Sequence, residues 1–577
     1  MKRYGKYIRP YWYAFILGPL LMLTEVAGEV LLPSFMADII NIGAANHDVG
    51  YIVQKGIIMI LTALIMMAGG VGGAWFASVA AINFGAGIRK DAFKKIQTFS
   101  FSEIDRFSTG SLVTRLTNDI TQVQNLIMMA LRMMLRAPGM LIGAIIMAFL
   151  MNRELAAVFL VILPVMTVAI ILLLRIAYPR FEFMQKKLDA LNSNIQEVLT
   201  NVRVIKSFVR EDYESARFEK SNAELKESSL NAFKIAIAQM PLMMLFMNLT
   251  TLVVVWLGGN QILDGKMQVG DLTAFTTYIV QVLMSLMMLA MVFLQSSRAF
   301  ASGRRINEVM DTQVSLTDDH AAYPEAVVKS GKIEFQNVSF QYYKDSAEKV
   351  LDQINLTIEP GQMIGIIGST GCGKTTLVSM IPRLYDVDEG KVLVDGIDVR
   401  DYSLNHLREG VGMVLQKNVL FSGTIEENLQ WGDENASKDQ IRKAAESAQA
   451  EGFIQKLADG YDTELGQGGV NVSGGQKQRL CIARALLKRP KILILDDSTS
   501  AVDTATEAKI REAFSTTLKE TTKLIIAQRI GSVMEADQIV VMDEGKIVGL
   551  GKHEDLLETC KAYQEIYDSQ MKKEVIA

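Results

Sequence analysis

The stretch GQMIGIIGSTGCGKTTLVSMI, residues Gly361–Ile381, decides the fold of the second half of the chain. An apolar run typical of a buried β-strand leads into a glycine-rich turn, and a helical pattern follows directly. The turn fits G-x-x-x-x-G-K-[ST], in which glycines let the backbone curl so that its N–H groups face phosphate oxygens. The sequence therefore predicts an α/β P-loop domain. Its expected phosphate-binding residues are Gly368, Ser369, Thr370, Gly371, Cys372, Gly373, Lys374, Thr375 and Thr376.

A later stretch, KILILDDSTSAVD at Lys491–Asp503, is expected to complete the nucleotide site. In the P-loop, Lys374 should reach the β- and γ-phosphates and the Thr375 hydroxyl should ligate Mg²⁺. Four apolar residues run into Asp496, which is expected to close the Mg²⁺ shell. Asp497 follows at the position where such enzymes normally carry the Glu that polarises the attacking water.

The first half of the chain is built from long apolar runs. Of the 577 residues, 50% are hydrophobic, and the apolar runs end near Arg298. A membrane-spanning helix needs about 20 mostly apolar residues. Six segments qualify: 13–37, 56–82, 127–151, 154–177, 240–263 and 270–297. The sequence thus predicts a six-helix transmembrane domain at 1–315, fused to the α/β P-loop domain at 330–577.

The distribution of charge predicts the orientation in the plasma membrane. Lys and Arg gather in segments 83–126 and 178–239, whereas 38–54 has neither. Because cytoplasmic loops carry the excess of positive charge, both termini and the P-loop domain are expected in the cytoplasm. The basic N-terminus is expected to be a cytoplasmic anchor, not a cleaved signal. A net charge of −4 gives no argument for nucleic acid, and three cysteines fit a reducing compartment.

The two long cytoplasmic segments and the charges within the spans have functional readings. Residues Leu188–Glu211 show apolar spacing typical of an amphipathic helix, which favours helices that project into the cytoplasm as levers over mere solubilising loops.

Charged residues in a bilayer are costly unless they face a cavity or each other, although an arginine near a helix end can snorkel. The 31 methionines could form an adaptable binding surface or simply pack. The charged residues concerned are Glu25, Glu29, Arg132, Arg136 and Arg298.

The stretch VSGGQKQRLCIARALL, Val472–Leu487, supplies a second phosphate-binding device, a Ser-Gly-Gly turn that opens a basic helix. One γ-phosphate does not need two such devices from one chain, but two chains packed head to tail would use both. With these motifs nearly the whole chain resembles ATP-binding cassette (ABC) exporters with six spanning helices ahead of one cassette. The resemblance implies ATP and Mg²⁺ as cofactors, and coupling helices near 101–109 and 209–216.

The resemblance also assigns roles by position. The signature that acts on a second chain's ATP would be Ser473, Gly474, Gly475 and Gln476. Tyr342 resembles the aromatic residue that stacks on adenine, and Gln416 resembles the Q-loop glutamine that senses Mg²⁺ and the transmembrane domain. The segment Ser500–Asp503, with Asp503, resembles the D-loop that crosses the dimer.

Three positions depart from the family pattern. Asp497 replaces the catalytic Glu, Gln528 replaces the switch His, and Gln467–Gly468 replaces a Glu-Arg pair. Asp is one methylene shorter than Glu, and a placement error of about 1 Å can cost on the order of 100-fold in rate. Gln528 can hydrogen-bond a γ-phosphate but cannot carry the charge of a protonated His. The P-loop site of this chain is therefore expected to bind ATP and hydrolyse it slowly.

These features predict one subunit of a heterodimeric exporter. Its partner would be a non-identical half-transporter whose hydrolytic site this chain's signature completes. The expected substrate is amphiphilic, drug-like or lipid-like, taken from the cytoplasm or the inner leaflet, with membrane lipid as a further contact. The alternatives are a homodimeric exporter with variant catalytic residues, an ATP-gated channel on the same scaffold, and a membrane-tethered regulator.

Overall fold

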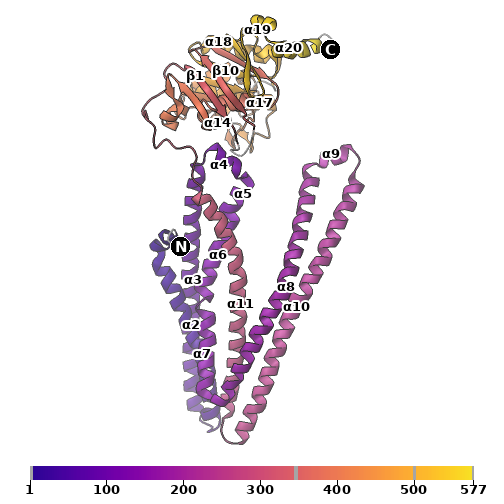
Figure 1. Ribbon diagram of the computed structural model, residues 1–577. Helices are drawn as coiled ribbons and strands as arrows, with labels where there is room; N and C mark the ends of the chain where they lie inside the picture. The colour runs from indigo at the N-terminus through magenta and orange to yellow at the C-terminus, as the bar shows by residue number, and fades with distance from the viewer. Residues whose placement is uncertain (1–3, 343–347, 498–501, 575–577) are drawn as a thin grey trace. The chain divides into compact units, whose positions relative to one another are not determined.

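The computed structural model describes residues 4–342, 348–497 and 502–574 (Figure 1). The chain divides into two compact units. The first comprises Met1–Ile96 and Gly110–Asp311, and the second comprises Gln97–Thr109 and Thr312–Ala577. The short segment Gln97–Thr109 therefore groups with the P-loop domain, although it lies within the first third of the sequence.

Long helices build the first unit, and six helical stretches among the described residues are long and apolar enough to cross a membrane, as predicted. Asn152 caps one of the long helices, because its side chain accepts a hydrogen bond from the Leu155 N–H at 3.0 Å. The elements are α1 (Gly5–Ile8), η2 (Arg9–Tyr11), α2 (Trp12–Asp38), η3 (Ile39–Ala44), α3 (Val49–Gln97), α5 (Thr109–Thr114), η4 (Arg115–Asp119), α6 (Ile120–Met133), α7 (Arg136–Met151), α8 (Arg153–Thr200), α9 (Val202–Ser207), α10 (Glu211–Leu263) and α11 (Val269–Asp311).

Glycines allow the close packing of α2 on α3. A Cβ atom at Gly69 would lie 2.9 Å from the Leu21 carbonyl oxygen, and one at Gly73 would lie 3.0 Å from the Gly18 carbonyl oxygen. Small residues are the usual means by which membrane helices bring their backbones together. The two helices can therefore approach at a distance that larger side chains would forbid.

Three of the five charged residues predicted inside the membrane pair with one another. Arg136 on α7 lies between two carboxylates of α2, with its Nη2 3.1 Å from Glu25 Oε1 and 3.3 Å from Glu29 Oε2. Of the two readings left open by the sequence, mutual pairing is the one observed for these three residues. A further ion pair, which the sequence did not reveal, joins η4 to α11: Arg305 Nε donates to Asp119 Oδ2 at 2.8 Å, and Asp119 is fully buried.

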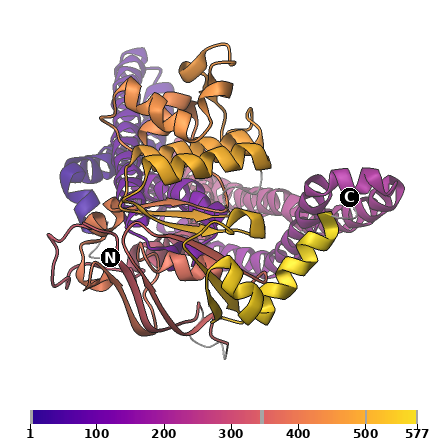
Figure 2. The ribbon, with the colours of Figure 1, turned by 90° about the horizontal axis from the view of Figure 1, so that it is seen from above.

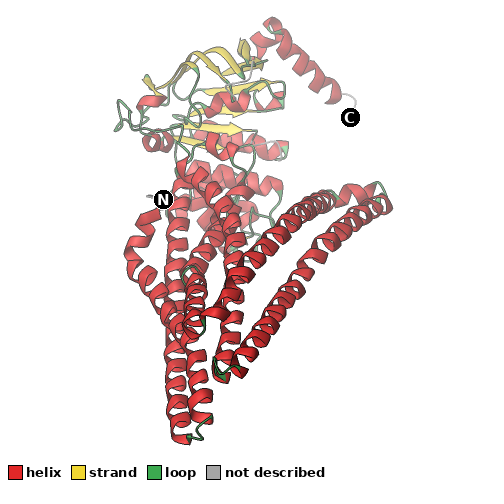
Figure 3. Cartoon of the chain, turned by 60° about the horizontal axis from the view of Figure 1, so that its bottom comes forward, coloured by secondary structure: helices red, strands yellow, loops and turns green. Residues whose placement is uncertain are grey.

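The helices α8 and α10 form a long hairpin that diverges from the other helices of the unit toward α9 (Figures 1 and 3). The second coupling helix was expected at 209–216, where the structure has a turn followed by the start of α10 at Glu211; the short helix α9 precedes it at Val202–Ser207. Val209 has a φ of 52°, which interrupts the helical path between α9 and α10. The tip exposes large apolar side chains, with Phe208 73% and Val209 81% exposed.

The second unit is an α/β domain built on two larger sheets. The four-stranded antiparallel sheet has the order β2-β1-β4-β5, and the six-stranded sheet has the order β12-β11-β3-β10-β9-β6. In the six-stranded sheet every pairing is parallel except that of β12 with β11. Figure 2 views these strands from above, with helices on either side of them.

The strands are β1 (Ile333–Phe340), β2 (Leu351–Ile358), β3 (Met363–Gly368), β4 (Glu389–Val394), β5 (Ile397–Asp398), β6 (Val411–Val414), β7 (Gly423–Thr424), β8 (Glu464–Leu465), β9 (Ile492–Asp496), β10 (Thr522–Ile526), β11 (Gln538–Asp543) and β12 (Lys546–Gly551). The helices are α4 (Phe101–Arg106), α12 (Lys374–Ser379), η5 (Val399–Asp401), α13 (Leu404–Glu409), α14 (Ile425–Gln430), α15 (Lys438–Ser447), α16 (Glu451–Ile454), η6 (Gly460–Asp462), α17 (Gly474–Leu487), α18 (Thr504–Thr517), η7 (Ile530–Ser532), α19 (His553–Thr559) and α20 (Lys561–Glu574).

The central parallel strands of the six-stranded sheet are buried on both faces, which explains the continuous apolar runs in their sequence. In β9, Ile492 and Ile494 pack into the core on one face, whereas Leu493 and Leu495 pack into the core on the other. Asp496, the last residue of the strand, emerges at its carboxyl end. In parallel sheets this end is where ligands bind, so the fold places the acidic residues beside the P-loop.

Candidate nucleotide-binding site

The P-loop connects β3 to α12, and its backbone requires glycine. Gly368, Gly371 and Gly373 have φ values of 156°, 87° and 97°, a region that residues with a side chain rarely adopt. A Cβ atom at Gly368 would lie 2.1 Å from the carbonyl oxygen of Met542 on β11. The loop can therefore curl tightly between β3 and the N-terminus of α12.

A cavity of about 810 Å³ opens over this loop. Lys374 lies inside it, and its Nζ donates to the carbonyl oxygens of Gly368 at 2.9 Å and Ser369 at 2.6 Å. Cys372, also predicted here, does not line the cavity: it is buried and packs into the core beneath the loop. The predicted residues that do line it are Tyr342, Gly368, Ser369, Thr370, Gly371, Gly373, Lys374, Thr375, Thr376, Gln416, Asp496, Asp497 and Gln528.

Thr375 and Asp496, two of the residues expected to ligate Mg²⁺, line the cavity together. The Thr375 hydroxyl donates to Asp496 Oδ1 at 3.0 Å. Asp496 is 2% exposed, and within the described residues its Oδ2 has no hydrogen-bond partner. Burial raises the pKa of Asp496, and the neighbouring Asp497 raises it further. A buried carboxylate oxygen without a partner, next to a hydroxyl, suits a hard cation that prefers oxygen ligands. These residues therefore fit Mg²⁺.

The two unusual residues of the site contact each other. The Gln528 side-chain amide donates to Asp497 Oδ2 at 2.7 Å. Asp497 has a φ of 48°, and its backbone N–H donates to the Ile526 carbonyl oxygen at 3.0 Å. Burial raises the pKa of Asp497, an effect that hydrogen bonds from the Gln528 and Gln416 side chains oppose. The substitutions at the catalytic and switch positions thus form one hydrogen-bonded unit, a pairing that the sequence did not reveal.

Tyr342, which lines the cavity, belongs to an aromatic cluster. Its hydroxyl lies 3.0 Å from Thr376 Oγ1, and its ring packs edge-on against Tyr385 with centroids 5.2 Å apart. The Tyr385 hydroxyl donates to Asp105 Oδ2 on α4 at 2.7 Å, and the Phe101 ring lies beside the same tyrosine. Sequence reasoning missed Tyr385, which joins the expected adenine-binding tyrosine to the predicted coupling helix α4.

The predicted signature lies on the surface, outside this cavity. Ser473 caps α17 in a capping box, since its N–H donates to Gln476 Oε1 at 2.9 Å and its Oγ accepts from the Gln476 N–H at 3.3 Å. Ser473 and Gly474 are exposed, and Gly475 and Gln476 are half-buried. Asp503 caps α18 by accepting from the Thr506 N–H at 2.9 Å, whereas the start of the D-loop at Ser500 lies outside the described residues.

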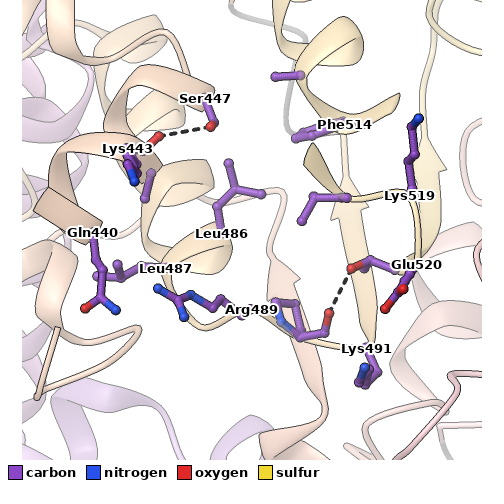
Figure 4. Close-up of a pocket in the computed structure, with 15 residues that line it drawn as sticks. Gln440, Lys443, Ser447, Leu486, Leu487, Arg489, Lys491, Phe514, Lys519 and Glu520 are labelled. Atoms are coloured by element: carbon purple, nitrogen blue, oxygen red, sulfur yellow. Dashed lines mark hydrogen bonds between the residues drawn. The ribbon is translucent and has the colours of Figure 1, made fainter. Parts of the chain in front are cut away.

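A second cavity, of about 560 Å³, has a different position and lining (Figure 4). Lys443, Arg489, Lys491 and Lys519 surround it together with apolar residues such as Phe514. It lies where β9 and β10 begin, at the opposite edge of the sheet from the P-loop. Because nucleotides bind at the carboxyl ends of parallel strands, the cavity over the P-loop is the candidate site.

Comparisons with known proteins agree with this geometry. The family models described as ABC transporter transmembrane region and ABC transporter match residues 15–286 and 351–500. The chain is 42% identical over 574 residues to the uncharacterized ABC transporter ATP-binding protein YfiB of Bacillus subtilis, covering 100% of this chain and 99% of that protein. It is 34% identical over 482 residues to an ATP-dependent lipid A-core flippase of Desulfotalea psychrophila, covering 84% of each.

Among solved structures, a bacterial Atm1-family ABC exporter with ATP bound matches with a TM-score of 0.79 and 25% identity, over 98% of both chains. The described residues thus combine six helices that can span a membrane with an ATPase domain, which is the domain content of an ABC exporter. The chain belongs to the ABC transporter family, as an exporter half-transporter of the plasma membrane that couples ATP hydrolysis to transport.

Proposed function

We propose that this chain is one subunit of a heterodimeric ABC exporter, with a transmembrane domain at 1–315 and a cassette at 330–577. Its own P-loop site holds ATP and Mg²⁺ and hydrolyses ATP slowly. The observation that carries this proposal is the hydrogen bond from Gln528 to Asp497 at 2.7 Å. It engages one oxygen, Oδ2, of the carboxylate that would polarise the attacking water, and Asp is also one methylene shorter than the Glu expected for that task.

The remaining residues of the site are suited to binding. Thr375 and Asp496 would hold Mg²⁺, with Gln416 beside them, while Lys374 would bind the β- and γ-phosphates. Tyr342 offers a ring face to adenine. Mg²⁺ would supply charge neutralisation for the phosphates when it is bound. The chain thus keeps what retention of ATP requires and lacks two groups that hydrolysis uses.

The signature would act on the partner. Ser473 and Gly474 are exposed at the N-terminus of α17, a helix of 14 residues whose backbone N–H groups suit an anion. In a head-to-tail pair, these residues would contact ATP bound to the partner's P-loop and complete its hydrolytic site. The apolar tip at α9 would dock on the partner's cassette, because side chains as exposed as those of Phe208 and Val209 need a cover.

The proposed substrate is an amphiphile, lipid-like or drug-like, moved out of the cytoplasm or the inner leaflet. Two observations support this class. One relative named above is a lipid A-core flippase, and the membrane half of the chain is rich in methionine, which adapts to varied apolar surfaces.

Heterodimerisation is tested by purification from the native membrane. The tagged chain is expected to co-purify with a second half-transporter that carries Glu and His at the positions of Asp497 and Gln528. Purified alone, the chain should show little ATPase activity; co-expressed with that partner, it should show activity that substrates stimulate. Robust substrate-stimulated turnover by the chain alone would instead favour a homodimer with variant catalytic residues.

The contact of Tyr385 with α4 predicts a defect in coupling. Tyr385→Phe keeps the ring against Tyr342 but removes the hydrogen bond to Asp105, which contributes about 1.5–3 kcal/mol because its acceptor is charged. We expect basal ATPase activity to change little and the substrate moved per ATP to fall in proteoliposomes. Tyr461→Phe is the matched control, since it removes a tyrosine–carboxylate bond to Glu451 elsewhere in the cassette. An unchanged ratio of transport to hydrolysis in Tyr385→Phe would exclude this coupling route.

A further inference from the structure

The C-terminal helix α20 forms one wall of the nucleotide cavity. Ala562, Glu565, Ile566, Ser569 and Gln570 line the cavity together with the P-loop. The nucleotide-binding and signature residues predicted from the sequence all lie outside this helix.

The helix is firmly attached to the sheet. Tyr563 is fully buried, and Ile566 and Tyr567 pack with it against the cluster formed by β3, β11 and η7. The Tyr563 hydroxyl also lies 2.7 Å from His553 Nδ1 on α19. Because its apolar side recurs at three- and four-residue intervals, α20 is an amphipathic helix fixed along one face. The helix backbone that carries the polar side chains next to the cavity is therefore held in place.

One of these side chains, that of Gln570, forms hydrogen bonds with the backbone around Gln528, the residue at the expected switch position. Gln570 Nε2 donates to the Gln528 carbonyl oxygen at 2.8 Å, and Gln570 Oε1 accepts from the Ile530 N–H at 2.9 Å. A single amide thus binds both sides of Arg529. The Gln528 side chain in turn donates to Asp497. The segment that carries Gln528 follows directly after β10, so its side chain depends on such contacts for its direction.

We propose that Gln570 is a positioning residue, which fixes the backbone at 528–530 so that the Gln528 amide faces the γ-phosphate end of the cavity. This inference rests on the proposed role of Gln528 as the switch residue. Gln570 does not itself touch nucleotide in this account. It sets how well the site distinguishes ATP from ADP, because only ATP carries the phosphate that Gln528 would contact.

The alternative is that Gln570 merely attaches the end of α20 to the domain. The two roles differ in what they predict for ADP. A loosened helix would lower the affinities for ATP and ADP alike, because it would disturb the whole cavity wall. A misdirected Gln528 side chain would lower the affinity for ATP alone, since ADP lacks the γ-phosphate.

The test is Gln570→Met in the full-length chain in nanodiscs, with Mg-ATP and Mg-ADP affinities measured by equilibrium binding at low temperature. Met keeps the length of Gln but can make neither bond. We expect ATP binding to weaken about threefold to tenfold, the range for one or two neutral hydrogen bonds, with ADP binding unchanged. Gln564→Met is the matched control, because Gln564 lies on the same helix and its side-chain amide donates to the Leu557 carbonyl oxygen at 2.5 Å, away from residues 528–530. It should leave both affinities unchanged.

Gln528→Ala separates this inference from its premise. It should lower the affinity for ATP but not for ADP. Adding Gln570→Met should lower the ATP affinity no further, because both substitutions act through the Gln528 side chain. An additive loss in the double variant, or an equal loss of ATP and ADP in Gln570→Met, would overturn the positioning role while leaving the switch in place. No selective effect of Gln528→Ala would overturn the switch assignment, and the positioning role with it. Thermal unfolding of each variant shows whether the fold is intact.

Discussion

Gly474→Asp in the signature is expected to lower the steady-state ATPase rate of the assembled heterodimer by about 10²–10³-fold, the cost of losing a donor aimed at developing charge. The new carboxylate would stand at the N-terminus of α17, facing the γ-phosphate on the partner's P-loop. The variant should still fold, because Gly474 is exposed and an acidic residue at a helix N-terminus is stabilising. Phosphate release at saturating Mg-ATP measures the effect.

Lys374→Ala in the same chain is the informative contrast. In the proposed heterodimer it should weaken ATP retention in the slow site and only reduce the overall rate, because hydrolysis would continue at the site completed by Ser473–Gln476. Equal abolition by Gly474→Asp and Lys374→Ala would indicate two interdependent catalytic sites. The reverse ranking would mean that the slow and fast sites have been assigned to the wrong chains.

Asp497→Glu combined with Gln528→His should restore hydrolysis at this chain's own P-loop site. The test uses a heterodimer whose partner carries Gln in place of its catalytic Glu, so that the partner's site is silent. A correctly placed carboxylate is expected to raise turnover on the order of 100-fold, the factor that an error of about 1 Å costs. Both changes are needed, because Gln528 and Asp497 are bonded to each other and each holds the other in its present position.

The source of the restored activity can be identified with a signature variant in each chain. Replacing the partner's signature serine with Arg should abolish the gain, whereas Ser473→Arg in this chain should leave it intact. If the double substitution yields no gain, the partner's signature is also defective, or the slow site differs in geometry beyond these two residues.

Features that depend on local pattern were predictable from the sequence. The six membrane spans follow from the length and apolar character of each run, and the P-loop follows from glycines whose positive φ the structure shows to be required. The buried strand before Asp496 was readable because a parallel sheet covered on both faces needs an unbroken apolar run. In each case the information lies within about 20 consecutive residues.

Features that depend on tertiary contact were not predictable in the same way. The Tyr385 hydroxyl meets Asp105 across 280 positions, and the Gln570 amide meets the Gln528 carbonyl across 42. No spacing rule connects such residues, since their proximity is a product of the completed fold. The break between α9 and α10 was missed for a local reason: the positive φ at Val209 is not evident in a valine, which strongly disfavours it.

The grouping of Gln97–Thr109 with the P-loop domain has a consequence for biosynthesis. Glu103 on α4 is buried and accepts a hydrogen bond at 3.1 Å from the Ser315 N–H, which lies 212 positions later. At about 5–20 residues per second, the ribosome delivers that partner roughly 10–40 s after Glu103 has been made. During this interval the first half of the chain enters the membrane while α4 still lacks the domain on which it packs. Mutations in α4 are therefore expected to act late, at the joining of an inserted membrane domain to a newly made cassette, and to appear as premature degradation of a correctly inserted chain.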